Sequence, residues 1–204
     1  MMGDNGIRRW AGNFRPAPTP GRPTILIYME NDTGYPKDVG RHSIRMKGYD
    51  YRQRGLYFVT ICVNKRLCLF GKIADGIMAL NDAGLMVEYW FAETANHFPT
   101  VCPLHMVVMP NHIHAIWLLD TTHLSPDSKA PTLGDVVGWF KTRTAYHYGQ
   151  GVRYHNWPAY DARLWQRNYF ESIISSEEDY RNKIWYIKQN PACWTEDDLY
   201  NVGW

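Results

Sequence analysis

Two histidines separated by a single residue lie in a run of the chain that has the composition of a buried β-strand. His112 and His114 flank Ile113 at the start of residues 112–119 (HIHAIWLL), which are otherwise apolar. Successive side chains of a strand point to opposite faces of its sheet, so both imidazoles are expected on one face, with Ile113 in the core behind them. Imidazole is the commonest metal ligand among protein side chains. The motif therefore predicts a sheet that carries a metal site on one face.

A second polar pair lies in the last helix that the sequence predicts. Ser176 is expected to cap a helix over residues 177–189, and Pro191 terminates it. Tyr186 and Asn190 are four residues apart, about 40° around the axis at roughly 100° per residue. Their side chains are therefore expected to share one face of this helix.

The other segments follow a recognisable order. Asn81 and Thr132 are predicted helix caps, and apolar runs rich in β-branched and aromatic residues predict strands. Strand, helix, strand, strand, helix, strand is the order of the α+β, ferredoxin-like split βαβ sheet, with 112–119 as a central strand. The last helix would lie across the sheet face that carries the histidines. The expected strands are 56–63, 104–109, 112–119 and 169–174, and the expected helices before the last one are 81–95 and 133–148.

Length and composition favour one domain with an extension. A chain of 204 residues is long enough for one well-buried core and short for two. Residues 1–41 are rich in Gly, Pro, Asn and Asp with scattered arginines, so we expect a mobile N-terminal arm, and 42–204 should form the domain. The net charge of +2 carries no global signature of a nucleic-acid binder.

Cysteine spacing and hydropathy predict a reducing, aqueous location. The four cysteines contain no CxxC pair and lie among apolar residues, so reduced buried thiols in a cytoplasmic protein are expected. No stretch approaches the roughly 20 apolar residues that a membrane-spanning helix needs. These cysteines are Cys62, Cys68, Cys102 and Cys193.

Three segments carry a resemblance to a known family. Residues 107–114 (VVMPNHIH), 164–171 (LWQRNYFE) and 186–191 (YIKQNP) resemble the single-tyrosine HUH transposases of the IS200 type. Within that family they are most similar to the branch associated with repetitive extragenic palindromes (REP). Residues 49–71 resemble the family's opening strand, so the similarity extends over roughly residues 42–195.

The resemblance implies roles for the two polar pairs. Tyr186 would be the catalytic nucleophile, and His112, His114 and Asn190 would bind Mg²⁺ or Mn²⁺, although these ligands would also accept Zn²⁺. Many members of the family have glutamine where this chain has Asn190, which is instead similar to the REP-associated branch. Tyr180 is about 240° around the helix from Tyr186 at roughly 100° per residue, so both cannot face one metal.

The resemblance also implies a single-stranded DNA partner. Hairpins of repetitive palindromes or insertion-sequence ends are the expected substrates, and both a monomer and a homodimer are compatible with the family. Cations and an aromatic residue near the segments that carry the resemblance are candidate DNA contacts. They are Arg45, Lys47, Arg52, Arg54, Lys141, Arg143, Arg163, Trp165 and Arg167.

The implied activity is metal-dependent cleavage and transfer of single-stranded DNA through a 5′-phosphotyrosine intermediate, as in DNA transposition. The chief alternative is a non-catalytic, domesticated hairpin-binding protein on the same fold. A third possibility is a small zinc hydrolase that uses His112 and His114 with a carboxylate, although no His-x-His-x-Asp-His run supports it.

Overall fold

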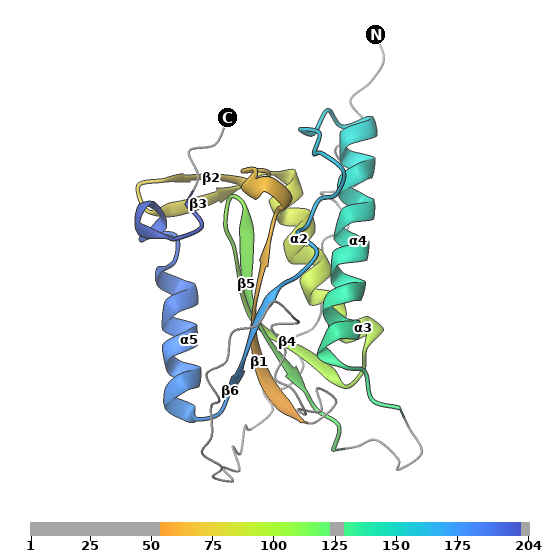
Figure 1. Ribbon diagram of the computed structural model, residues 1–204, viewed down its shortest axis with the longest axis vertical. Coiled ribbons are helices and arrows are strands. Elements are labelled where there is room, and N and C mark those ends of the chain that lie inside the picture. Colours follow the sequence, from red (N-terminus) through yellow and green to blue (C-terminus); the bar gives the residue numbers. More distant parts are fainter. Residues whose placement is uncertain (1–53, 123–128, 201–204) are drawn as a thin grey trace, which may run out of the picture. The chain divides into compact units, whose positions relative to one another are not determined.

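A computed structural model describes residues 54–122 and 129–200 of the chain. Within these ranges a single four-stranded sheet is covered by helices on both faces (Figure 1). The expected N-terminal arm, residues 1–41, lies outside the described residues.

The sheet is antiparallel throughout. Its strands are β1 (Gly55–Cys62), β4 (Val101–Val108), β5 (His112–Leu119) and β6 (Phe170–Ile174). They lie in the order β4-β5-β1-β6, and each neighbouring pair is antiparallel. This order and direction confirm the ferredoxin-like arrangement, in which the histidine strand β5 is central.

Three longer helices begin at the caps that the sequence predicts. They are α2 (Asp82–Ala92), α4 (Leu133–Tyr154) and α5 (Glu177–Gln189). The side chains of Asn81, Thr132 and Ser176 each accept a hydrogen bond from a backbone N–H of the first turn. Helices α2 and α4 cover one face of the sheet and α5 covers the other (Figure 1).

Alternation along the strands divides the core into two layers. On the face beneath α2 and α4, here the apolar face, Tyr57, Val59, Ile113 and Trp117 are fully buried. On the face beneath α5, here the histidine face, a smaller apolar cluster of Leu56, Phe58, Ile116, Leu118, Ile174 and Ile187 lies next to the two histidines.

Three predicted boundaries are wrong. Helix α2 ends at Ala92, three residues before the expected end. Strand β4 begins at Val101, three residues early, and contains Pro103 beside a register shift; β4 is an edge strand, where a proline costs no ladder hydrogen bond. Helix α4 continues through Gly151 to Tyr154. Gly151 is required there because a Cβ would lie 2.1 Å from the ring of Trp157, which packs against the helix.

Several short elements were not predicted. The strands β2 (Gly71–Ala74) and β3 (Ile77–Leu80) form a separate hairpin. Its two-residue turn is Asp75-Gly76, both with positive φ, as the tight turn of such a hairpin requires. The remaining short elements are α3 (Thr94–His97) and two 3-10 turns, η1 (Asn64–Arg66) and η2 (Trp194–Glu196).

The four cysteines are unpaired, as expected, but they are not uniformly buried. Cys62 is buried, Cys68 and Cys102 are half-buried, and Cys193 is exposed, so the expectation of four buried thiols is wrong. Among the described residues, none of the helices combines the length and the apolar character that crossing a membrane demands.

Candidate metal centre and nucleophile

The two imidazoles project together from β5 onto the histidine face, as the alternation of the strand predicts. Their Nε2 atoms are 3.0 Å apart, and the side chains of His112 and His114 are almost wholly buried. Adjacent ligand atoms around an octahedral ion with bonds near 2.1 Å are separated by about 3 Å. The spacing of the two nitrogens therefore suits a single divalent cation.

The ring orientation of His112 is set by its neighbour. The Nδ2 group of Asn111 donates to the carbonyl oxygens of Leu199 at 2.8 Å and of Arg66 at 3.3 Å. Its Oδ1 consequently faces His112 Nδ1 at 2.8 Å and accepts a hydrogen bond from it. This places the proton on Nδ1 and leaves the Nε2 lone pair free for a metal, an orienting contact typical of metal-binding histidines.

His114 is held from the adjacent strand. Thr60 lies directly opposite His114 in the register of β1 and β5, and its hydroxyl shares a hydrogen bond of 2.7 Å with His114 Nδ1. The ring of Phe58 stacks on the His114 imidazole with a centroid distance of 5.5 Å. The Nε2 atoms of both histidines are thereby directed to one point above the sheet.

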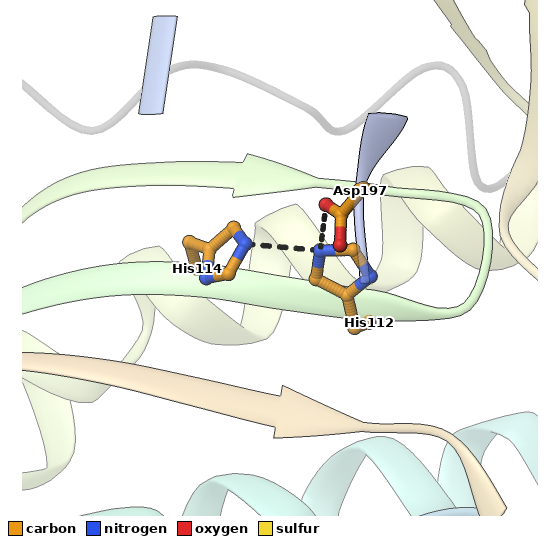
Figure 2. A group of neighbouring side chains, drawn as sticks. All are labelled: His112, His114 and Asp197. Atoms are coloured by element: carbon orange, nitrogen blue, oxygen red, sulfur yellow. Dashed lines mark hydrogen bonds and ion pairs between the residues drawn. The ribbon is translucent and has the colours of Figure 1, made fainter. Parts of the chain in front are cut away.

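A carboxylate that the sequence analysis missed completes this cluster. Asp197 follows η2, and its Oδ2 lies 3.8 Å from His112 Nε2 (Figure 2). The ligand atoms of His112, His114 and Asp197 all lie within 4.8 Å of one another. In sequence Asp197 is an ordinary acidic residue of a polar C-terminal segment, and only the turn of the chain after α5 brings it to the histidines.

Two buried acceptor atoms at this site have no hydrogen-bond partner. They are Oδ1 of Asn190 and Oδ2 of Asp197. A buried polar atom left without a partner costs free energy, and a buried carboxylate oxygen costs more than a neutral group. Together with two imidazole lone pairs, the unpartnered oxygens form a set of acceptors that a cation would satisfy. The residues present therefore fit a divalent metal.

Burial keeps both imidazoles neutral. It lowers the pKa of His112 to about 3, with Arg66 adding to the effect and the Asn190 amide opposing it. Burial also places the pKa of His114 well below its usual range, and the charges of His112 and Lys183 act in the same direction. Only the neutral form of imidazole can bind a metal.

Tyr186 on α5 faces the histidine pair. Its hydroxyl lies 3.3 Å from His114 Nε2, and its side chain is 40% exposed, so a large substrate can reach it. Burial raises the pKa of Tyr186; Asp197 and Asp198 raise it further, and the Asn190 amide lowers it. The phenol is therefore protonated at neutral pH, and nucleophilic attack requires charge stabilisation at the oxygen.

A cation that the sequence analysis missed adjoins the nucleophile. The Lys183 ammonium lies 4.8 Å from the centroid of the Phe58 ring, and the same ring meets Tyr186 edge-on at 5.9 Å. Within the described ranges Lys183 forms no ion pair. Its position one helical turn before Tyr186 is the signal that sequence spacing could have supplied.

The candidate DNA contacts that the structure describes differ in their surroundings. Arg45, Lys47 and Arg52 lie outside the described residues. Arg54 pairs with Asp120 at 3.5 Å, and Arg163 and Arg167 are exposed.

The other three are held by structural contacts. Arg143 lies over the rings of Trp90 and Trp139. Lys141, whose pKa burial lowers to about 8, donates to the carbonyl oxygens of Gln166 and Arg167 at 2.6 and 3.1 Å.

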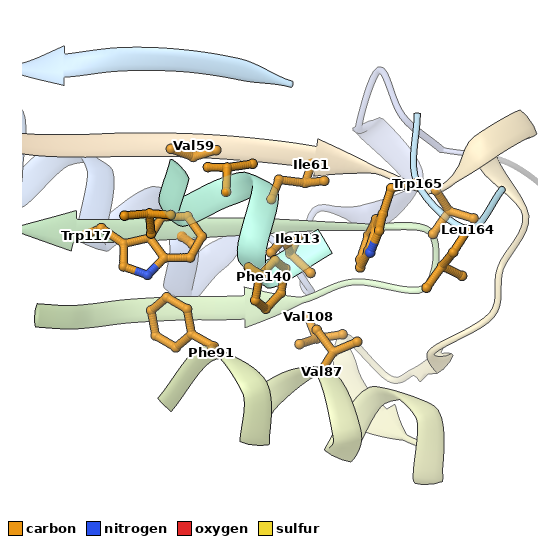
Figure 3. Packing of buried hydrophobic residues seen from close by; sticks show 14 of the residues in the cluster. Val59, Ile61, Val87, Phe91, Val108, Ile113, Trp117, Phe140, Leu164 and Trp165 are labelled. Atoms are coloured by element: carbon orange, nitrogen blue, oxygen red, sulfur yellow. The ribbon is translucent and has the colours of Figure 1, made fainter. Parts of the chain in front are cut away.

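Trp165 belongs to the core. It is 4% exposed and packs beside Phe140 (Figure 3). Its indole N–H donates to Thr144 Oγ1 at 2.8 Å. The prediction of a DNA contact disagrees with this placement, because a ring enclosed on both sides cannot stack on a base.

Comparisons with known proteins find relatives in sequence and in fold. No family model matches the sequence. An uncharacterised protein of Haemophilus influenzae is 36% identical over 177 residues, which cover 78% of this chain and 93% of that protein. A second H. influenzae protein, provisionally named a REP-associated tyrosine transposase, is 26% identical over 148 residues, covering 70% of this chain and 73% of that protein.

One solved structure has a similar fold. The structure of a REP-associated tyrosine transposase bound to a REP hairpin aligns with a TM-score of 0.50 and 19% identity, over 78% of this chain and 91% of that one. The strand order of the sheet is consistent with this likeness in fold. The chain is thus similar in sequence and in fold to REP-associated tyrosine transposases, the branch that the sequence analysis expected.

Proposed function

We propose that this protein is a metal-dependent single-stranded DNA endonuclease and strand transferase that cleaves beside hairpin repeats through a covalent 5′-phosphotyrosine on Tyr186. The observation that carries the proposal is the 3.3 Å contact between the Tyr186 hydroxyl and His114 Nε2 beside a buried cluster of metal-ligating groups. The choice of hairpin DNA rests on the relative solved with a REP hairpin.

His112, His114 and Asp197 would hold the cation, with the Asn190 amide oxygen as a further donor. A bound Mg²⁺ or Mn²⁺ would neutralise charge on the phosphate and favour the phenolate form of the tyrosine. Mixed nitrogen and oxygen ligands with open positions suit a cation that also contacts phosphate oxygens.

The chain's own groups perform the bond exchange. The Tyr186 oxygen forms a bond to phosphorus while the bond from phosphorus to the 3′ oxygen breaks. The phenol proton is lost to solvent, which the partly exposed side chain contacts, and the leaving 3′ oxygen takes up a proton. Lys183 stands beside the nucleophile as a cation for the backbone phosphate. Because the phosphodiester bond energy is kept in the adduct, a 3′-hydroxyl can later attack it and rejoin the strand.

The test is incubation of the purified protein with Mn²⁺ or Mg²⁺ and end-labelled single-stranded hairpins from the repeats flanking its gene. A covalent protein–DNA band on a denaturing gel is expected, and EDTA should remove it. Tyr186→Phe should abolish the band while hairpin binding remains. Tyr180→Phe is the matched control, because that hydroxyl contacts His105 Nε2 at 3.1 Å instead of the histidine pair.

Adducts that persist in Tyr186→Phe would refute the assignment of the nucleophile. Tight hairpin binding without any adduct in the wild type would instead indicate the non-catalytic hairpin-binding protein.

A further inference from the structure

One aromatic side chain near the C-terminal strand is left exposed on the histidine face. Phe170, the first residue of β6, is 53% exposed. The neighbouring aromatics differ from it, because they pack against the core of the apolar face. These are Trp139, Trp157, Tyr160, Trp165 and Tyr169.

The sheet register places Phe170 in line with the site. Phe170 lies directly opposite Thr60 on β1, and Thr60 lies directly opposite His114 on β5. Residues directly opposite each other in an antiparallel pair project to the same face. Phe170, Thr60 and His114 therefore form a row across three adjacent strands, which at about 4.8 Å per strand puts Phe170 roughly 10 Å from His114.

The groups beside this row suit a nucleic-acid backbone. Phe58, which neighbours Thr60 on the same face, carries the Lys183 ammonium 4.8 Å above its ring and meets Tyr186 edge-on. From the nucleophile outward, the site thus presents the Tyr186 hydroxyl, the Lys183 ammonium and the exposed ring of Phe170. Exposed aromatic rings beside cations are how proteins hold single-stranded nucleic acid, with the base stacked on the ring.

We propose that Phe170 is a stacking platform for a nucleobase next to the scissile phosphate, and that Lys183 contacts the backbone phosphate of the same nucleotide. This inference rests on the proposed function and names a positioning subsite for its substrate. Stacking holds the flanking nucleotide, and the phosphate is thereby presented to Tyr186. Because every base has a flat face, this subsite fixes position with little selection for base identity.

The experiment uses the Tyr186→Phe protein, so that the DNA stays intact, and hairpins with 2-aminopurine at successive single positions of the flanking strand. Stacking quenches 2-aminopurine fluorescence, so one position should be quenched on binding. Adding Phe170→Ala should relieve that quenching and weaken binding of the flanked hairpin on the order of 10-fold.

Two further replacements at Phe170 test whether a flat ring is needed or whether apolar volume is enough. Phe170→Trp should retain the quenching, and Phe170→Leu, which keeps apolar volume without a flat ring, should not. Tyr154→Ala removes another exposed aromatic side chain, at the C-terminal end of α4, and should change neither readout.

The outcomes distinguish this subsite from the cleavage proposal. Quenching that persists in Phe170→Ala, or none at any position in a protein that binds the hairpin, refutes the stacking platform. Quenching that depends on Phe170, in a protein whose wild type forms no adduct, supports the platform and refutes cleavage. Failure to bind any hairpin refutes both.

Discussion

The two faces of the sheet are built from the same strands but differ in what they hold. On the apolar face, side chains such as Val59, Ile61 and Trp117 are enclosed by α2 and α4 (Figure 3). On the histidine face, a small apolar cluster supports one helix and lies beside the two histidines, Asp197 and the exposed ring of Phe170. The apolar layer thus supplies most of the burial that stabilises the fold, which allows the other face to carry groups that stabilise nothing by themselves.

Buried polar atoms without hydrogen-bond partners have different consequences in the core and at the site. Trp90 and Trp117 each have an indole N–H without a partner. At the site the unpartnered atoms are acceptors, on Asn190 and Asp197, beside imidazoles whose lone pairs converge. Donors scattered in a core only cost stability, whereas converging acceptors define a position for a cation.

The largest expected effect is on the apolar face. Phe140 is fully buried between Trp117 and Trp165, so Phe140→Ala should lower the free energy of unfolding by about 3–5 kcal/mol. Denaturant titration measures it. Phe170→Ala, the same replacement at an exposed position of the histidine face, should cost less than about 1 kcal/mol. Equal losses would remove the contrast between the faces.

The next effect is on metal binding at the histidine face. Asp197→Asn removes the one carboxylate of the cluster, so affinity for Mn²⁺ should fall at least about tenfold. Without metal, the variant should be as stable as wild type or more stable, because the negative charge beside the unpartnered Oδ2 is removed while Oδ1 can still accept from the Leu199 N–H. Calorimetric titration measures the affinity for Mn²⁺, and thermal unfolding measures the stability without metal. Asp198→Asn, at the exposed neighbour, is the control, and unchanged affinity in Asp197→Asn would exclude this ligand.

A smaller effect is expected at the cap of α4. Thr132 and Asp135 form a reciprocal capping box, so Thr132→Ala should cost about 1 kcal/mol of stability. Adduct formation by the folded protein should be unchanged, because α4 does not contribute to the site. A loss of adducts at temperatures where the variant is folded would show that the two faces are coupled.

The smallest effect is a pH dependence on the apolar face. Burial raises the pKa of Tyr148, whose hydroxyl donates to the Pro158 carbonyl oxygen at 3.0 Å. The stability that comes from keeping this phenol protonated is fully present below the unfolded pKa of about 10 and is lost as the pH rises above it. At pH 10.5 the loss in the free energy of unfolding is about 0.8 kcal/mol. The wild type should lose that much more stability than Tyr148→Phe between pH 8 and 10.5, and parallel curves would contradict the prediction.

The features that the sequence predicted well are local ones. Asn81, Thr132 and Ser176 cap helices through bonds to residues three positions away, and the strand period places His112 and His114 on one face. The same locality explains why Tyr186 and Asn190 were found together. Local patterns fail where contacts between distant residues determine the structure. Helix α4 continues through Gly151, where the ring of Trp157 packs against the helix. Trp165 can be buried because Thr144 accepts a hydrogen bond from its indole N–H.

By itself, the sequence determined the order of the elements, the strand that holds the imidazoles and the helix that holds the tyrosine. These follow from periodicity and capping, which act within a few residues. Only the tertiary structure decided that Asp197 closes the cluster, that Asn111 orients His112 and that Phe170 stands exposed in line with His114. Each depends on segments distant in sequence meeting above one sheet face, and no local rule encodes such a meeting because it is set by how the whole core packs.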